Sequence, residues 1–494
     1  MRVSVHIAVL VALWLISGCA SGPDFEKPAA PEVSGYTAGS LSMAKSLPNL
    51  AGGGTQRLVS GRDIPAEWWT LFRSKPLDDL IARALAANPS LKAAQAALKA
   101  AHENTLAQYG AYYPNIAVGF SATRQKTSAQ LQPTPNSGAL TYGLYMPQVS
   151  VSYTPDVFGL NARTIESLRA QEGQVRFALV AANIALSANV VAAAIQEASL
   201  REQIAATRES VAINTDMLML LRNQLARGGA SRLDIAAQES QLAQVTATLP
   251  PLIAQLAQQR DLLAVLAGGF PSADIVERFD LSRLDLPREL PLSLPSKLVE
   301  QRPDVRQAEE NLHAASAQIG IAVANRLPSL TLTADAGNMA LAAGQMLSGG
   351  TGFWTLGTSL AQPVFEGGML LHRERAARAA YIQAAEQYRS VVLAAFQNVA
   401  DTLNALKQAA NSLNAAVAAR DAARATLDLT RRQLQSGSVN YLAVLNAEQT
   451  YQQARINLVQ AQASRFADTA ALFVALGGGW WNGVDGNEKE VAHR

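Results

Sequence analysis

The longest pattern in the chain is a helical stretch from Asn161 to Arg227 that contains no proline. Alanine and glutamine dominate it, and Gly173 alone interrupts the good helix formers. At about 1.5 Å rise per residue a helix of this length spans roughly 100 Å, which no compact core can contain. The pattern predicts a long antiparallel hairpin packed like a left-handed coiled coil. Its heptad positions are Ile204, Val211, Leu218 and Leu225, and the returning segment carries Leu242, Val245, Leu249, Leu252, Leu256, Leu263 and Leu266.

Two segments ahead of this helix alternate between apolar and small polar residues. The alternation predicts β-strands over about residues 114–124 and 143–155, each with one apolar face. In the first strand one face carries Ile116, Val118 and Phe120, and the other carries Gly119 and Ser121. The first half of the chain therefore predicts helix, strand, strand, long helix (161–227), turn and returning helix.

The second half repeats this order. Landmark prolines recur at a constant spacing, Pro89 as Pro303 and Pro114 as Pro328, and equal spacing at two landmarks indicates an internal repeat. Further strands are predicted over about 328–338 and 353–363, and a second long helix over 368–435. The expected organisation is a first repeat at 66–269, a connector at 270–295, a second repeat at 296–476 and a polar tail at 477–494.

The N-terminus has the features of a signal peptide over residues 1–18, with an apolar run that ends in small residues before Cys19. This ending resembles the lipobox of bacterial lipoproteins, in which the thiol is acylated and the cysteine becomes the new N-terminus. A plain signal peptide with an incidental cysteine is the alternative. Ala20, in place of an aspartate, favours the outer membrane. Residues 19–65, rich in Pro, Gly and Ser, predict a tether.

We expect no apolar stretch outside the signal peptide to approach the roughly 20 residues of a spanning helix, so the mature chain should be anchored or span as a barrel. Composition narrows the function further. Charged residues make up 16% of the 494 residues and the formal net charge is +2, which predicts no nucleic-acid surface. A single cysteine excludes an intramolecular disulfide and a cysteine metal site.

Enzyme motifs are absent from the sequence. Neither Gly-x-Ser-x-Gly, His-Glu-x-x-His nor Gly-x-Gly-x-x-Gly occurs, and His102, His313 and His372 lie far apart. We expect no catalytic residue, no metal and no cofactor other than a covalent lipid on Cys19.

Four strands per chain cannot close a membrane barrel, since the smallest have about eight. Several copies must therefore combine. Two copies would give eight strands around a filled interior, whereas three would give twelve strands around a lumen lined by small residues such as Gly119, Ser121, Gly357 and Ser359. A barrel with an apolar outer face and a hydrated lumen indicates a channel across a membrane.

Several motifs in order resemble the TolC-like outer-membrane factors, and most closely the OprM/NodT-type lipoproteins that serve resistance-nodulation-division efflux pumps. Besides the lipobox and the repeat, the motifs are Pro155-Asp156-Val157-Phe158-Gly159, Pro303-Asp304-Val305-Arg306 with Ala308-Glu309, Phe365-Glu366-Gly367-Gly368 and Ala475-Leu476-Gly477-Gly478-Gly479-Trp480. The resemblance implies a mainly α homotrimer with a small β part, in which an α-helical barrel continues into a 12-stranded transmembrane β-barrel in outer-membrane lipid. It also implies a periplasmic adaptor and an inner-membrane pump as partners.

In that family, rings of side chains just past the two hairpin turns close the periplasmic end of the tunnel. Counted from the turn glycines, the resemblance assigns an acidic position to Asp234, an apolar constriction to Leu442 and an acidic ring to Asn446. The asparagine departs from the family's pattern, as does Ala443, which stands where TolC has a second acid. The resemblance therefore implies a gate with fewer charges than the family's pattern has.

Two bases near the first turn, Arg227 and Arg232, are expected partners for Asp234. The same segment, Ser231 to Asp234, is also a capping box, and Leu442 is also a possible seam residue. We keep both interpretations open at this point. The function implied is a passive conduit for small molecules such as drugs and toxic compounds. The alternatives are a non-conducting, lipid-anchored coiled-coil spacer and a channel for type I protein secretion.

Overall fold

The computed structural model describes residues 21–37, 50–128 and 140–483. These residues form two compact units. The strand unit comprises the described parts of Met1–Pro28, Leu98–Val175 and Ala308–Tyr388, and the hairpin unit comprises those of Ala29–Ala97, Arg176–Gln307 and Arg389–Arg494. Cys19 lies outside the described residues.

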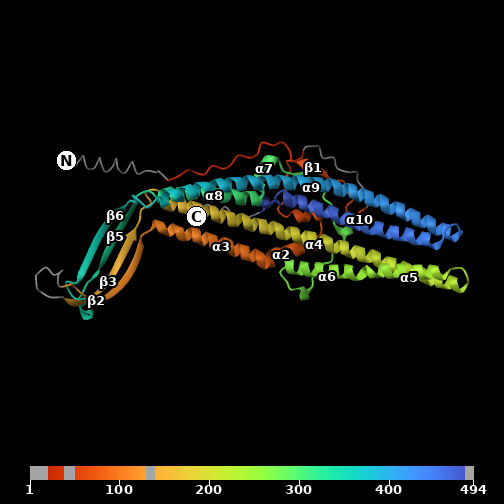
Figure 1. Cartoon of the computed structure of the whole chain (residues 1–494), viewed down its shortest axis with the longest axis horizontal. Helices are drawn as coiled ribbons and strands as arrows, with labels where there is room; N and C mark the ends of the chain where they lie inside the picture. Colours follow the sequence, from red (N-terminus) through yellow and green to blue (C-terminus); the bar gives the residue numbers. More distant parts are fainter. Residues whose placement is uncertain (1–20, 38–49, 129–139, 484–494) are drawn as a thin grey trace. The chain divides into compact units, whose positions relative to one another are not determined.

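The strand unit holds one antiparallel sheet (Figure 1). Its strands are β2 (Asn115–Lys126), β3 (Thr141–Tyr153), β5 (Ser329–Asn338) and β6 (Gly352–Ala361), in the order β2-β3-β5-β6. Some apolar residues face each other across the ladders, as Ile116 does with Val151 and Leu330 with Leu360. The predicted strand bounds lie close to these observed ones.

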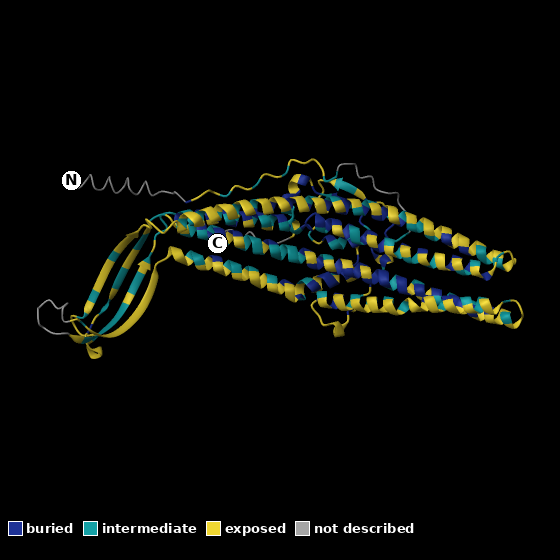
Figure 2. Cartoon of the chain, viewed as in Figure 1, coloured by how far each residue is buried: buried dark blue, intermediate teal, exposed yellow. Residues whose placement is uncertain are grey.

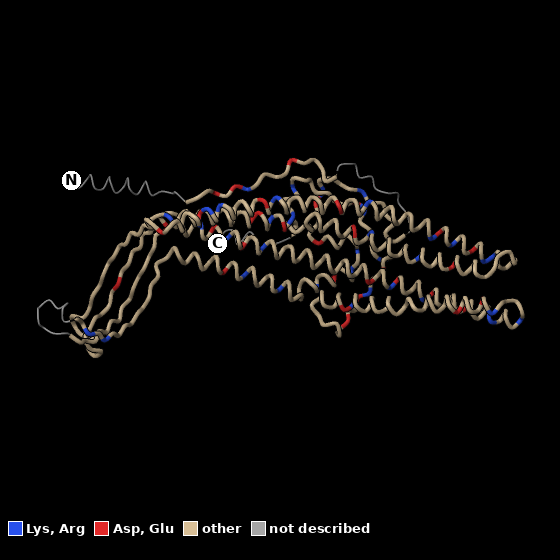
Figure 3. Tube along the Cα trace, viewed as in Figure 1, with Lys and Arg blue, Asp and Glu red and all other residues tan. Residues whose placement is uncertain are grey.

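One face of this sheet is apolar and uncovered in the single chain. Val118 is 85% exposed and Trp354 is 74% exposed, and no residue of the sheet is fully buried in Figure 2. Charge is scarce along the strands (Figure 3), where Arg124, Lys126 and Asp335 are the charged residues. A surface of this kind is unfavourable in water and matches hydrocarbon.

Helices make up most of the rest. Their bounds are α2 (Lys75–Ala87), α3 (Pro89–Tyr109), α4 (Leu160–Ala226), α5 (Arg232–Ala247), α6 (Leu249–Leu266), α7 (Pro295–Gln301), α8 (Pro303–Ala324), α9 (Met369–Gln435) and α10 (Tyr441–Ala475). α4 and α9 each have 67 residues. We therefore match each residue of α4 with the residue at the same position in α9, so that Leu160 corresponds to Met369 and Ala226 to Gln435. The constant difference in residue number between the two helices is called the helix offset.

The two long helices end in the same way. After α4, the backbone amide of Gly229 donates to the carbonyl of Gln224 (2.8 Å), and after α9 that of Ser438 donates to Gln433 (2.9 Å). Gly228 and Gly437 adopt positive φ, which glycine reaches without steric cost. This is the Schellman arrangement, and it turns each long helix back into α5 or α10.

Aromatic residues form the core of the hairpin unit. Trp68 stacks on Phe473 with ring centroids 5.5 Å apart, and Phe72 contacts Phe466 at 6.3 Å. The glycine run before Trp480 also belongs here, since a β-carbon on Gly479 would lie 2.4 Å from the carbonyl oxygen of Pro65. The described residues 477–483, predicted as the start of a polar C-terminal tail, pack against this core.

Two further expectations are corrected by the structure. The tether contains a strand, β1 (Arg57–Ser60), that pairs in parallel with β4 (Glu289–Leu292) of the connector. The segment that returns from the first turn breaks at Thr248, because Pro250 and Pro251 start a new helix rather than continue α5.

α4 also contains an 18-residue window with mean hydropathy 2.0, apolar and long enough to cross a membrane by composition alone. The expectation that no second such stretch exists was wrong. No charged residue occurs between Arg176 and Glu197. Several of its larger side chains are nevertheless buried within the hairpin unit, namely Phe177, Val190, Val191 and Ile195. Core packing accounts for this composition.

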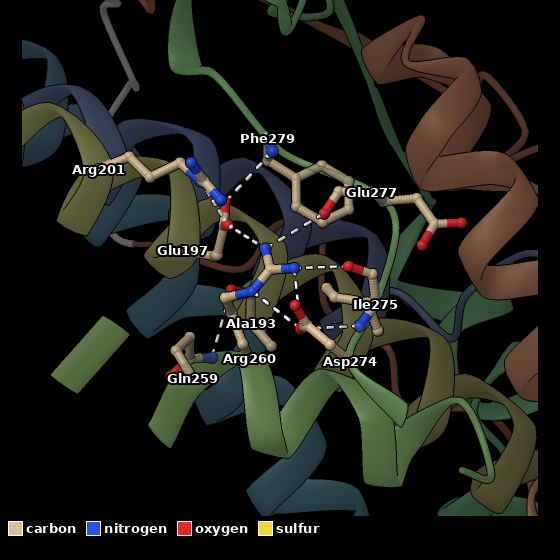
Figure 4. A network of polar contacts seen from close by, with 9 residues as sticks. All are labelled: Ala193, Glu197, Arg201, Gln259, Arg260, Asp274, Ile275, Glu277 and Phe279. Atoms are coloured by element: carbon tan, nitrogen blue, oxygen red, sulfur yellow. Dashed lines mark hydrogen bonds and ion pairs between the residues drawn. The ribbon is translucent and has the colours of Figure 1, made fainter. Parts of the chain in front are cut away.

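A buried carboxylate holds the connector against the helices (Figure 4). Glu197 of α4 is fully buried and accepts from Arg201, from Arg260 (3.1 Å) and from the backbone amide of Phe279 (3.2 Å). Arg260 also bonds Asp274 (3.0 Å) and holds the pKa of that carboxyl below its usual range. Charge-assisted hydrogen bonds thus fix the first part of the connector, in addition to the pairing of β4 with β1.

We predict that Glu197→Gln lowers the free energy of unfolding by about 3 kcal/mol, because it leaves two arginines without their buried counter-charge. Thermal unfolding, with hydrogen exchange at the Phe279 amide, measures the effect. Glu202→Gln is the matched control. Burial, with Asp280 adding, raises the pKa of Glu202. Folding therefore disfavours the ionised form of Glu202 at pH 7. The neutral glutamine should leave the free energy of unfolding unchanged or raise it. Equal losses in both variants would contradict the assignment.

Candidate functional site

The residues predicted for the gate lie at the ends of the two hairpins. Leu442 and Asn446 are exposed and lie one turn apart on α10, so they share one face of that helix. Asp234 lies in the first turn of α5. Arg227 and Arg232 are exposed beside the first turn, and among the described residues neither forms an ion pair with Asp234.

Asp234 takes part in a complete capping box. Its backbone amide donates to Oγ of Ser231 (3.1 Å), and its carboxylate accepts from the Ser231 backbone amide (2.8 Å) and hydroxyl (2.7 Å). Asn440 caps α10 in the corresponding place, through the amide of Ala443. Within the protomer the Asp234 carboxylate is therefore occupied by helix capping.

A buried chain of hydrogen bonds links the two hairpins close to these ends. The hydroxyl of Tyr441 on α10 donates to Oε1 of Gln238 on α5. Nε2 of Gln238 donates to the carbonyl oxygen (2.8 Å) and the side-chain oxygen (3.0 Å) of Asn214 on α4. All three side chains are buried. Every link in this chain is uncharged, so its strength depends on geometry rather than on net charge.

Titratable groups surround this chain. Burial raises the pKa of Tyr441, with Glu448 and Asp234 adding to the rise and Arg431 opposing it. Burial likewise raises the pKa of Glu448, which faces Arg431 at 3.9 Å. The tyrosine therefore stays protonated, as a donor, throughout the physiological range.

Sequence reasoning missed this buried chain, although a signal was present. Asn214 follows the heptad residue Val211 by three positions, where a coiled-coil seam carries an apolar side chain. A buried polar residue at such a position needs a partner, and Gln238 supplies it. The partner could not be located from sequence, because it depends on the stagger between helices.

The segment after Cys19 is held firmly in the strand unit. Buried Arg163 of α4 donates to the carbonyl of Ser21 (3.0 Å) and to the carboxylate of Asp24 (2.7 Å). Phe25 stacks on His313 with centroids 4.3 Å apart. Gly22, at φ +87°, allows the segment to lie directly on Gly320. No cluster that could hold a metal occurs among the described residues.

An antiparallel sheet with an apolar face, joined to two very long helices, is the architecture of an outer-membrane channel protein. The profile of the outer membrane efflux protein family matches residues 80–269 and 294–478, and the chain belongs to this family. It is thus an outer-membrane channel component of an efflux system, and it extends into the periplasm.

Three similar proteins illustrate the relationship. Toluene efflux pump outer membrane protein TtgF of Pseudomonas putida is 32% identical over 485 residues, with 96% of each chain covered. Outer membrane protein OprJ of Pseudomonas aeruginosa is 27% identical, with 99% of this chain and 97% of OprJ covered. The structure of the outer-membrane channel OprN matches with a TM-score of 0.83 at 25% identity, covering 94% of this chain and all of OprN.

We predict that Tyr441→Phe loosens the hairpin ends, because it leaves the buried side-chain oxygen of Gln238 without its donor at a cost of about 1–3 kcal/mol. Single-channel recording in planar bilayers should detect longer openings, and hydrogen exchange should increase around Gln238. Tyr451→Phe is the matched control, since Tyr451 lies on the same helix against Arg455 and uses its ring face. Unchanged openings in Tyr441→Phe would exclude a role for this bond in closure.

Proposed function

We propose that the chain acts as a homotrimeric passive conduit, in which three sheets close a 12-stranded barrel and the long helices form a tunnel. The observation that carries this proposal is the sheet itself. Its apolar face is exposed, and neither β2 nor β6 has a second strand partner among the described residues. Unpaired backbone groups are not tolerated in lipid, so each open edge requires the edge of another copy.

The internal repeat supplies the register of that contact. β5 corresponds to β2 at the spacing of Pro114 and Pro328, which matches Ser329 with Asn115. Asn115 of β2 faces Ser152 of β3, and its counterpart Ser329 of β5 faces Ala361 of β6. Ala361 is therefore the counterpart of Ser152, and β6 corresponds to β3 at the helix offset. Within the chain, Ser150 of β3 faces Asp335 of β5. When each residue of this pair is replaced by its counterpart in the other repeat, Ser359 of β6 stands opposite Ser121 of β2 in the next copy.

We predict that Ser359→Cys combined with Ser121→Cys forms disulfides between copies, which denaturing gels read as dimers and trimers. Directly opposite residues in a ladder lie about 4.5–5.5 Å apart at Cβ. Ser359→Cys with Ala117→Cys is the matched control, since it keeps the same face but shifts the register by four positions, roughly 13 Å. The only native cysteine is Cys19, so the background is low. Cross-linking of the control pair instead would refute the transferred register.

The partners follow from the family. We propose that the hairpin ends meet a periplasmic adaptor and that a resistance-nodulation-division pump in the inner membrane supplies the energy. The names of the relatives mention toluene efflux, antibiotic efflux and pyoverdine export, which supports small-molecule cargo. A non-conducting spacer would not need a sheet with an apolar face and two open edges.

The gate is proposed at Leu442 and Asn446, with Asp234, Arg227 and Arg232 around the other turn. Three copies of Leu442 would form an apolar collar that closes by excluding water. Leu442→Ser should raise conductance, whereas Asn446→Asp should favour cations and make closure depend on salt. Leu393→Ser, at an exposed leucine of α9 far from both turns, is the control. Wild-type currents in Leu442→Ser would move the gate elsewhere.

Lipid attachment is proposed at Cys19, where only the thiol can accept a diacylglyceryl group. We predict that Cys19→Ser abolishes labelling by radioactive palmitate while the chain still reaches the envelope. Label retained on the variant would place the acyl chain on another residue.

A further inference from the structure

A small cavity lies in the strand unit, where the helices lead into the strands. Its volume is about 290 Å³, and aromatic, cationic and acidic side chains line it together. Tyr109 and Tyr112 come from the end of α3 and the turn after it, Ile165, Glu166 and Arg169 from α4, and His313 from α8. The chain enters β2 shortly after Tyr112, and Ile116, the first outward residue of that strand, is 69% exposed.

Arg169 is the cation of this cavity. Its guanidinium carbon lies 5.3 Å from the centre of the Tyr109 ring, and the Tyr109 and Tyr112 rings are 6.3 Å apart. Stacking on a ring leaves the N–H edges of a guanidinium free to donate. Among the described residues, Arg169 forms no ion pair.

The acid within the cavity is already engaged. One carboxylate oxygen of Glu166 accepts from Arg163 (2.7 Å), and the other contacts Nε2 of His313 (3.0 Å). Glu166 is therefore held by two other bases, and the positive charge of Arg169 is left without a counter-ion from the described chain.

In the second repeat the corresponding arginine has a carboxylate partner, Glu374, which also pairs with Arg326. At the helix offset Arg378 corresponds to Arg169, and its Nε and Nη2 donate to Glu374 (3.0 and 2.9 Å). Glu374 in turn corresponds to Ile165, so the first repeat has an isoleucine where the second has the acid. At this position the first repeat therefore has an arginine that lacks a carboxylate partner in the described part of the chain and stands against tyrosines.

We propose that Arg169, with Tyr109 and Tyr112, binds the phosphate of a glycerophospholipid in the periplasmic leaflet of the outer membrane. Arginine matches phosphate in two-pronged geometry, and tyrosines favour the boundary between hydrocarbon and water. Acyl chains attached to that phosphate would cover Ile116 and Val118. A free phosphate shares the headgroup chemistry but lacks these chains. The inference rests on the proposed membrane position of the strands.

The test is native mass spectrometry of the purified trimer with added dioleoyl phosphatidylglycerol. We expect the wild type to retain the lipid, Arg169→Gln to lose on the order of tenfold in retention, and Arg378→Gln to behave as wild type. Dioleoylglycerol, which has the same chains without phosphate, should not be retained. Arg169→Lys keeps the charge but not the paired donors, so it should retain an intermediate amount.

Three outcomes would overturn the proposal. Equal retention by Arg169→Gln and wild type excludes the arginine, and displacement of the lipid by inorganic phosphate assigns the cavity to a soluble anion. Dissociation of Arg169→Gln into monomers means that a neighbouring copy supplies the counter-ion. Gel mobility distinguishes an error in the proposed barrel from an error in the proposed lipid site. If the barrel does not form, the wild-type trimer loses its heat-dependent gel mobility. If only the lipid site is wrong, that mobility stays intact.

Discussion

The pairing of backbone hydrogen-bonding groups is the constraint on which the rest of the structure depends. Helices α4 and α9 satisfy it internally along 67 residues each, so they can extend far beyond any globular core. The sheet satisfies it only between its strands and leaves the outer edges of β2 and β6 open. In a single chain the backbone groups within the helices are therefore paired, whereas those at the sheet edges are not. The sheet with the unpaired edges is also the part that has the exposed apolar face.

The same incompleteness appears in the hairpins. Several predicted seam residues, including Val211, Leu252 and Leu256, are only half-buried in one chain, which is expected when neighbouring helices come from other copies. Deep burial near the hairpin ends is shared by apolar residues such as Leu221 and Val444 and by two polar residues, Asn214 and Gln238. Apolar packing tolerates sliding, whereas a hydrogen-bonded pair has one favourable stagger, so these residues specify how α4, α5 and α10 align.

Sequence patterns with a fixed period were sufficient to predict the strands and long helices, because burial on one face requires that period. The Schellman turns were also accessible, since glycine at Gly228 and Gly437 leaves few conformations. The pairing of β1 with β4 was not, because two very short strands far apart in the chain carry no periodic signal. Nor were the connector ties around Glu197, because their partners are set by tertiary geometry alone.

The two repeats share a backbone plan but differ in charge, and this difference is informative at the hairpin ends. At the helix offset Asp234 corresponds to Ala443, so an acid in one hairpin corresponds to an apolar residue in the other. That one acid caps α5 and accepts from Ser231. Asn446, one turn beyond Leu442, is uncharged. On the second hairpin the proposed gate residues, Leu442 and Asn446, are uncharged, so closure there rests on apolar contact and on neutral hydrogen bonds such as that of Tyr441. Such contacts are insensitive to screening by salt, unlike a ring of carboxylates, which repels itself at low ionic strength.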